Sequence, residues 1–234
     1  EQVFETNYKD PLKPWARRSA SGLFDCIRQI MKEIEDELGR MSPYEQKHLY
    51  GTFYIKKGSD PEIRTFSKAE ALRWGKTKEG KPLYREIQYL KNDLLKALVK
   101  DIGRHLDTEI LAYFHHVQGF SEGKGVLTNM LEHTINRKPR HVINMDLENA
   151  FHQITKNNIK MLAQHVFGWN NKRAYTFAHV MTHNGKMVQG NPTSPIILNL
   201  LALIMDFRIL GFCKSVPNLK LKYTRYADDI TISS

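Results

Sequence analysis

Two adjacent carboxylates stand near the end of the sequence, where they are positioned to do chemistry. Asp228 and Asp229 follow Tyr226-Ala227 between two apolar stretches, which predicts a tight turn between strands. Neighbouring carboxylates repel each other and destabilise a fold unless a cation lies beside them. Asp146 ends another strand-like stretch after apolar neighbours. Pairing of the two strands would therefore bring a third carboxylate to the same place.

Three acidic side chains at one point are suited to Mg²⁺, which takes hard oxygen ligands at about 2.0 to 2.1 Å and keeps positions open for water and phosphates. Two such ions about 3.5 to 4 Å apart can activate a hydroxyl nucleophile and stabilise a pyrophosphate leaving group. Mn²⁺ accepts the same ligands. Alternatively, Asp228-Asp229 is a solvated turn and Asp146 is a helix N-cap, since aspartate is preferred at both positions.

The composition describes a globular protein with a basic surface. Apolar residues make up 41% of the 234 residues, which argues against disorder, and the length permits one large domain or two small ones. The 35 Lys and Arg exceed the 25 Asp and Glu, leaving a formal charge of +10. A basic balance of this kind suits a protein that holds a phosphate backbone, although charge alone does not choose the partner.

The sequence gives no sign of export or of a membrane span. Cys26 and Cys213 are far apart, without the spacing of a disulfide framework or a zinc site, which favours a reducing cytoplasm. No secretory signal is visible at the beginning of the sequence. The apolar run Ile196–Met205 contains Asn199 and is too short to cross a bilayer. No membrane partner is expected.

Periodicity and turn signals predict a mixture of helices and short strands. Apolar residues recur at helical spacing over residues 23–38, and Ser42 begins a capping box for a short second helix ending at Tyr50. Ser194 is the expected N-cap of an apolar helix, and Asn184-Gly185 predicts a hairpin turn. The other expected elements are strands over 52–55, 63–66 and 141–146, helices over 90–102, 156–167 and 195–210, and hairpins over 180–188 and 219–233.

Three motifs, in one order, carry a resemblance to a known family. Residues 146–151, Asp-Leu-Glu-Asn-Ala-Phe, resemble the first palm motif of reverse transcriptases, and 189–195, Gln-Gly-Asn-Pro-Thr-Ser-Pro, resemble the second. Tyr226-Ala227-Asp228-Asp229 is similar to the third. The middle motif is the most diagnostic, because Tyr-x-Asp-Asp is common by chance. Further likeness to bacterial retron and group II intron-like enzymes lies in Gly119-Phe120, Gly125-Val126, Asn129 and His133.

The resemblance implies roles for single residues. Asp146, Asp228 and Asp229 would be the catalytic, metal-binding carboxylates, with the Leu147 carbonyl as a further ligand. Phe151 would be a steric gate that excludes the ribose 2′-hydroxyl; the alternative for Phe151 is ordinary core packing.

The resemblance also implies nucleotide contacts. Gln189 and the backbone of Gly190 would lie against the incoming dNTP and the template base. Lys78 and Arg85 would hold the triphosphate, with 85–87 leading into a helix. The pair Lys57 and Arg64 has the same spacing and remains an alternative, as do plain surface charges.

The expected fold is α+β: a right-hand polymerase with a helical N-terminal extension over 1–50, fingers over 51–140, and a palm with an antiparallel sheet over 141–234. Related enzymes continue from the third motif into more palm strands and a thumb. The palm would thus be incomplete and the thumb absent, so these residues alone are expected to give weak or no processive synthesis.

The function implied is an RNA-directed DNA polymerase of the retron or antiphage-defence type, which extends a primer 3′-hydroxyl with two Mg²⁺ ions. Expected partners are an RNA template, a DNA or RNA primer, dNTPs, a cognate non-coding RNA and an effector protein. Alternatives are a group II intron or CRISPR-associated reverse transcriptase, an RNA-dependent RNA polymerase, and a catalytically silent nucleic-acid-binding scaffold.

Overall fold

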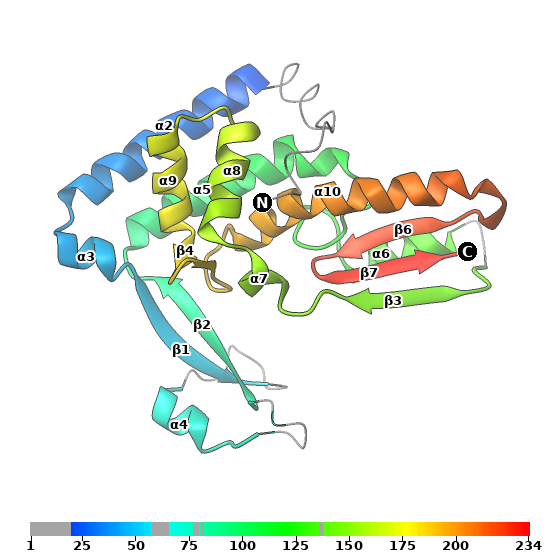
Figure 1. Ribbon diagram of the computed structural model, residues 1–234, viewed down its shortest axis with the longest axis horizontal. Helices are drawn as coiled ribbons and strands as arrows, with labels where there is room; N and C mark the ends of the chain where they lie inside the picture. The colour runs from blue at the N-terminus through cyan, green and yellow to red at the C-terminus, as the bar shows by residue number, and fades with distance from the viewer. Residues whose placement is uncertain (1–19, 58–65, 77–79, 81, 136–137) are drawn as a thin grey trace.

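The fold is α+β, with a helical body, a projecting two-stranded hairpin and a separate three-stranded antiparallel sheet (Figure 1). The computed structural model describes residues 20–57, 66–76, 80, 82–135 and 138–234. The predicted strand 63–66 lies almost wholly outside these ranges; of it only Phe66 is described, as an isolated bridge to Tyr54.

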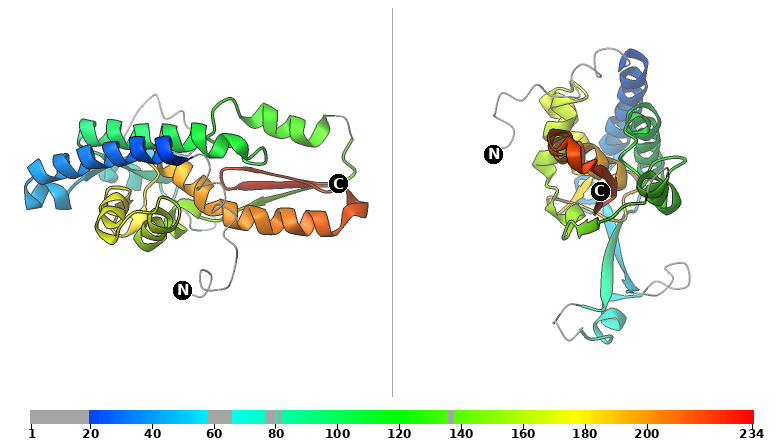
Figure 2. Two further views of the ribbon diagram at one scale, coloured as in Figure 1. Left: turned by 90° about the horizontal axis from the view of Figure 1, so that it is seen from above. Right: turned by 90° about the vertical axis from the view of Figure 1, so that its right-hand side faces the viewer.

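Two long helices form one side of the body. Helix α2 (Ala20–Arg40) lies along α5 (Asp93–Glu109), as the view from above shows (Figure 2). The predicted apolar stripe of α2 is buried against this neighbour, and Ile27 and Ile34 are fully inaccessible. Helix α5 begins after Asn92, whose side chain accepts a hydrogen bond from the Leu95 N–H, so it starts later than the predicted residue 90.

Helix α3 is short and leads directly into a strand. Its capping box forms as predicted: the Ser42 side chain accepts from the Glu45 N–H, and Glu45 accepts from the Ser42 N–H. The predicted end at Tyr50 is wrong. Helix α3 covers Pro43–Lys47, and Tyr50 is already paired in the first strand.

The projecting hairpin consists of β1 (Tyr50–Lys56) and β2 (Tyr84–Leu90), with short helix α4 (Lys68–Leu72) at its far end (Figures 1 and 2). The two strands pair antiparallel from Tyr50 opposite Leu90 to Lys56 opposite Tyr84. Residues 85–87 therefore lie within a strand, and five residues separate Ile87 from the start of α5. The prediction that they lead into a helix did not include this strand.

The three-stranded sheet has the order β3-β7-β6. Its strands are β3 (Val142–Asp146), β6 (Lys222–Tyr226) and β7 (Asp229–Ser233), which match the predicted strand and hairpin. Helix α6 (Val126–Thr134) is tied to the sheet through buried His133, whose two ring nitrogens lie 2.7 Å from Ser233 Oγ and Thr224 Oγ1. These buried contacts give His133 a structural role.

A helical segment follows β3 and returns to the body. It comprises α7 (Ala150–Gln153), α8 (Lys156–His165) and α9 (Asn171–Val180), of which α8 matches the predicted helix. Next come two short strands, β4 (Thr182–His183) and β5 (Lys186–Met187). The predicted turn joins them, with φ of 49° at Asn184 and 76° at Gly185, which is the two-residue turn that suits the twist of a hairpin.

Helix α10 (Ser194–Ser215) crosses the body beside the sheet (Figure 1). Its N-cap is Thr193, so the predicted Ser194 cap is wrong; Ser194 is the first helical residue and is fully buried. The apolar run that seemed too short to cross a bilayer belongs to this 22-residue helix, which by length and composition is long enough. Of its apolar window, 44% is buried inside the protein, and a single helix of this kind is weak evidence for a membrane span.

Candidate functional site

The turn between β6 and β7 carries the paired carboxylates. Tyr226 and Asp229 face each other as the last pair of the hairpin, so Ala227 and Asp228 form a two-residue turn. Ala227 has a φ of 57° and is only 4% exposed. A left-handed backbone costs an alanine about 1 to 2 kcal/mol, which the packing of the turn must offset.

Strand β3 brings the third carboxylate to this turn. Asp146 lies opposite Asp229 at the end of the β3–β7 ladder. One residue further on, the Leu147 N–H donates a hydrogen bond of 3.0 Å to the backbone carbonyl of Asp228. Backbone pairing therefore places Asp146, Asp228 and Asp229 together, as the sequence predicted.

The electrostatics of the three aspartates fit a cation site. Burial raises the pKa of Asp229, and the charges of Asp228 and Asp146 raise it further. A divalent cation would reverse this penalty, and carboxylate oxygens are the ligands that Mg²⁺ prefers. Among the described residues, no group of three or more His, Cys, Asp or Glu side chains is already drawn together closely enough to hold a metal. Asp146 and Asp229 are exposed and Asp228 is half-buried, so a cation could reach these neighbouring carboxylates from solvent.

The positions of Leu147 and Phe151 bear on the roles predicted for them. The carbonyl of Leu147 accepts a 3.3 Å hydrogen bond from the Ala150 N–H, so one of its two lone pairs remains for a metal. Phe151 lies in α7, partly buried against the main core. The core packing offered as the alternative for Phe151 is therefore present, and its role as a gate stays a prediction.

The loop before α10 is fixed by buried polar contacts. Asn191 Nδ2 donates to the Tyr50 hydroxyl at 2.9 Å, and the Thr193 hydroxyl donates to the Val99 carbonyl. Gly190 packs against β2: a Cβ there would lie 1.8 Å from the Gln88 carbonyl oxygen. Close approach to a strand already explains this glycine. The nucleotide contacts of Gly190 and of half-buried Gln189 stay predictions.

The cations expected to hold a triphosphate are only partly described. Arg85 is exposed on β2, opposite Ile55. Lys78 lies outside the described residues, as does Arg64 of the alternative pair, whereas Lys57 is exposed at the end of the first strand of the hairpin. The choice between the two pairs stays open.

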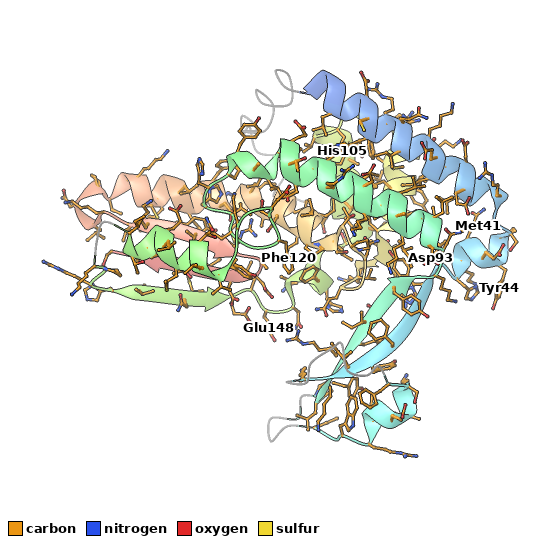
Figure 3. All side chains as sticks on the ribbon, turned by 180° about the vertical axis from the view of Figure 1, so that it is seen from behind. Met41, Tyr44, Asp93, His105, Phe120 and Glu148 are labelled. Carbon is orange, nitrogen blue, oxygen red and sulfur yellow. The ribbon has the colours of Figure 1, made fainter. Side chains whose placement is uncertain are left out.

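An exposed aromatic ring lies beside the turn. Phe120 has a φ of 56° and is 49% exposed, and its ring centroid lies 6.4 Å from that of Tyr226 (Figure 3). A bulky residue in the left-handed region is strained, and such strain often accompanies function.

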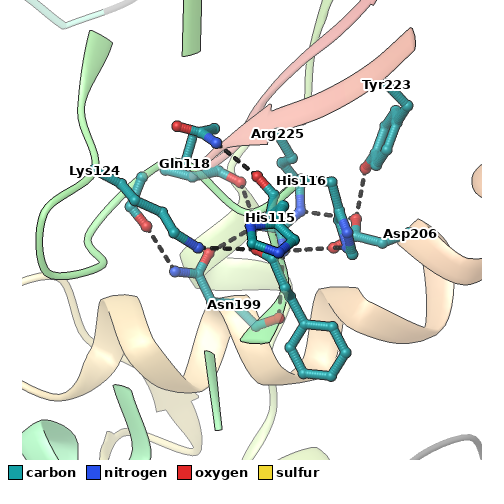
Figure 4. A network of polar contacts seen from close by, with 11 residues as sticks. His115, His116, Gln118, Lys124, Asn199, Asp206, Tyr223 and Arg225 are labelled. Carbon is teal, nitrogen blue, oxygen red and sulfur yellow. Dashed lines mark hydrogen bonds and ion pairs between the residues drawn. The ribbon is translucent and has the colours of Figure 1, made fainter. Parts of the chain in front are cut away.

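Sequence reasoning missed a buried polar cluster beneath the turn (Figure 4). Its centre is Arg225, which is fully buried and pairs with Asp206 of α10. A signal was present: Asn199 and Asp206 lie seven residues apart in an apolar helix, which puts both on one face. We call this group the Arg225 cluster; its members are His116, Asn199, Asp206, Tyr223 and Arg225.

Comparison with known proteins assigns the class. Residues 76–234 match the family model described as "Reverse transcriptase (RNA-dependent DNA polymerase)". The chain therefore belongs to the reverse transcriptase family.

Within that family, its relatives include enzymes of bacterial retrons. It is 28% identical over 199 residues to the retron Se72 reverse transcriptase of Salmonella heidelberg, covering 85% of this chain and 48% of the relative. It is 32% identical over 116 residues to the retron Ec86 reverse transcriptase of Escherichia coli, covering 50% of this chain and 34% of the relative. The chain thus spans about half or less of the length of these relatives.

Proposed function

We propose that the protein is an RNA-directed DNA polymerase of the retron type, with Asp146, Asp228 and Asp229 as its catalytic carboxylates. The observation that carries this proposal is the β3–β7 pairing that sets Asp146 opposite Asp229, beside Asp228, in a chain of the reverse transcriptase family. The basic surface, with a formal charge of +10, suits a template–primer duplex.

The mechanism follows from the three neighbouring carboxylates of Asp146, Asp228 and Asp229. When bound, two Mg²⁺ ions would lower the pKa of the primer 3′-hydroxyl and neutralise charge on the triphosphate. Asp146 and Asp228 would hold the ions, Asp229 would add negative charge beside them, and the Leu147 carbonyl would be a further ligand. The primer oxygen attacks the α-phosphate of the dNTP, a new phosphodiester bond forms, and pyrophosphate leaves. The protein contributes mainly positioning, because its carboxylates are fixed by backbone pairing.

The parts of the fold take the roles expected of a right hand. The sheet β3-β7-β6 and its flanking helices form the palm over 141–234, and the β1–β2 hairpin belongs to the fingers over 51–140. Residues 1–50 are a helical extension, of which α2 and α3 are described. The projection of the hairpin away from the body supports this division (Figure 1).

Nucleotide selection is assigned to residues around the aspartates. Phe151 is the gate against the ribose 2′-hydroxyl: it lies in α7, five residues after Asp146, and it is only partly buried against the core. Gln189 and Gly190 lie against the nascent base pair, and Arg85 with Lys78 contacts the triphosphate. Exposure of Arg85 on β2 supports its part in this set.

Retron relatives suggest the remaining partners. The template is a cognate non-coding RNA, the primer is RNA or DNA, and the product takes part in antiphage defence with an effector protein. Both cysteines are free thiols, which suits the reducing cytoplasm.

Primer extension tests the proposal. The full-length protein is given an RNA template, a DNA primer, Mg²⁺ and one dNTP, and single additions are timed. Asp228→Asn should lower the rate by on the order of 10²-fold or more, because it removes a carboxylate that would hold the ions stabilising negative charge in the transition state. Asp36→Asn, an exposed change on α2, is the matched control and should keep the wild-type rate. Equal rates in all three proteins would refute the assignment.

A further inference from the structure

The Arg225 cluster uses every hydrogen-bond donor of a fully buried arginine (Figure 4). Two donors face a carboxylate: Nε and Nη2 lie 2.9 and 2.8 Å from the two oxygens of Asp206. Two reach Asn199, from Nη1 to its side-chain oxygen at 2.8 Å and from Nη2 to its backbone carbonyl at 3.3 Å. Nη1 also donates to the backbone carbonyl of Ala227 at 2.8 Å. An arginine has five N–H groups, so none is left over.

The bond to Ala227 connects the cluster to the turn that carries the carboxylates. Ala227 is the first residue of the two-residue turn, and Asp228 is the second. The Ala227 carbonyl belongs to the peptide unit that leads directly into Asp228. A donor fixed on that carbonyl therefore sets the orientation of the backbone from which Asp228 projects.

A second contact reaches the turn from the same cluster. Asn199 Nδ2 donates to the Gly119 carbonyl at 2.8 Å, and Gly119 lies so close to the turn that a Cβ on it would be 2.4 Å from the Ala227 nitrogen. The segment before Gly119 is bonded to β6, from the Arg225 N–H to the His116 carbonyl and from the Gln118 N–H to the Arg225 carbonyl, both at 2.8 Å. The turn is thus hydrogen-bonded at the Ala227 carbonyl, and Gly119 packs closely against its Ala227 nitrogen.

The rest of the cluster keeps the arginine charged and in place. Asp206 is fully buried, accepts a 2.5 Å hydrogen bond from the Tyr223 hydroxyl, and has His116 Nε2 at 3.3 Å from its Oδ2. Burial opposes ionisation of Asp206, but its contacts with His116 and Arg225 outweigh burial and hold its pKa below the ordinary value. The carboxylate therefore stays ionised and anchors the guanidinium to α10.

A buried ion pair of this kind is a poor means of stabilising a fold, because desolvation offsets much of its attraction. A hydrophobic pair would fill the same space between α10 and β6. The feature that a hydrophobic pair lacks is a directed donor aimed at the Ala227 carbonyl. A planar fork with fixed donor directions also explains arginine in place of lysine.

We infer that Arg225 is a positioning residue for the polymerase reaction: anchored by Asp206 and Asn199, it holds the Ala227 carbonyl so that Asp228 and Asp229 face Asp146. This inference rests on the proposed function. It assigns no chemistry to Arg225, which acts on the reaction only through the turn.

The test compares variants of the full-length protein. The double variant Arg225→Met/Asp206→Asn removes both buried charges together and leaves an acceptor for Tyr223, so the fold is expected to survive. The single variant Arg225→Lys keeps a positive charge beside Asp206 but cannot span both Asp206 and the Ala227 carbonyl. Arg173→Met/Glu35→Gln is the matched control, since it removes a forked ion pair between α9 and α2, with N–O distances of 3.2 and 3.4 Å.

Four readouts separate positioning from plain stability. In the folded double variant and in the Arg225→Lys variant, the rate constant of single-dNTP addition should fall about 10- to 100-fold, as expected when reacting groups are misplaced by about 1 Å. The KM for dNTP should change by less than about threefold, on the same reasoning. Amide hydrogen exchange of a peptide covering 222–234 should be faster, and Mn²⁺ binding measured by electron paramagnetic resonance should weaken, both without any turnover. The control variant should match wild type in all four.

The results distinguish failure of the positioning role of Arg225 from failure of the proposed polymerase function. If a folded double variant or Arg225→Lys matches wild type in rate constant, exchange and Mn²⁺ affinity, the positioning role is wrong. Wild-type values in Arg225→Lys together with defects in the double variant would also overturn it, because a charge without the guanidinium fork would then suffice. Failure of the proposed function is distinguishable, since wild type itself would then add no dNTP, while hydrogen exchange would still report on the turn.

Discussion

Asp146 and Asp229 face each other directly across the antiparallel pairing of β3 and β7. Like charges at opposite positions of a sheet destabilise it. Strand β3 nevertheless ends and β7 begins on such a pair, and Asp228 adds a third charge beside it. The position makes sense as a cation site, and its cost leads to the first prediction.

Removing one charge from this site should stabilise the metal-free protein. Asp229→Asn relieves the repulsion from Asp146 and Asp228 that raises the pKa of Asp229. We expect a higher melting temperature than wild type in EDTA, and a smaller difference when Mg²⁺ is added, since Mg²⁺ stabilises wild type more. Differential scanning fluorimetry at pH 7 measures both. Asp36→Asn serves as the control, and an Asp229→Asn protein that melts below wild type in EDTA would contradict the prediction.

Shortening the ring at Phe151 should relax sugar selection. Phe151→Val removes the bulk that would collide with a ribose 2′-hydroxyl, so the ratio of kcat/KM for dNTP over rNTP should fall by about 10-fold or more, the discrimination available to a steric pocket. Phe207→Val is the matched control, because Phe207 is another phenylalanine partly buried against the core, in α10. Unchanged sugar selectivity in Phe151→Val, measured by single-nucleotide addition, would refute the gate.

Replacing Gly190 by alanine (Gly190→Ala) should push β2 and the loop before α10 apart. The added Cβ would meet the Gln88 carbonyl oxygen at 1.8 Å, so β2 or the loop must move. We expect a loss of about 1 to 3 kcal/mol in unfolding free energy, as for other overpacked sites. Gly211→Ala is the control: nothing lies within 4 Å of its Cβ, and alanine favours a helix. Urea denaturation that ranks the two variants equally would show that the close contact does not matter.

Acid should weaken the anchor of Arg225. The pKa of Asp206 lies below its ordinary value, because contacts with His116 and Arg225 outweigh burial. The unfolded chain therefore takes up this proton first as the pH falls. The stability that Asp206 contributes is present above its unfolded pKa of about 3.9 and is lost as the pH falls through the folded pKa. Urea midpoints from pH 6 to pH 3 should fall more steeply for wild type than for Asp206→Asn. Parallel curves would contradict the prediction.

Local signals in the sequence were enough for most helices, for the β6–β7 hairpin and for the meeting of the three aspartates. Periodicity located α2, Asn184-Gly185 located a turn, and apolar stretches ending in Asp146 and around Asp228 implied paired strands. These features depend on neighbours in the chain or on a single strand pairing.

Features set by distant contacts escaped prediction. Strand β2 was missed because its partner β1 lies some thirty residues earlier, and the strand predicted over 63–66 offered β1 a nearer partner. The Arg225 cluster was missed because a buried arginine has no periodic signature; it depends on α10, β6 and the segment at His116 coming together in space. The reason for Gly190 was likewise visible only once β2 lay against it.

The central claim is that Asp146, Asp228 and Asp229 together bind the ions that drive nucleotide addition. Its most direct test is a crystal structure of the full-length protein with an RNA template, a DNA primer lacking its 3′-hydroxyl, an incoming dNTP and Mn²⁺, with anomalous scattering used to locate the ions. We predict anomalous peaks at the end of β3, within ligand distance of Asp146 and Asp228 and of the triphosphate. Ions bound to the triphosphate with all three carboxylates turned away from them would contradict the account.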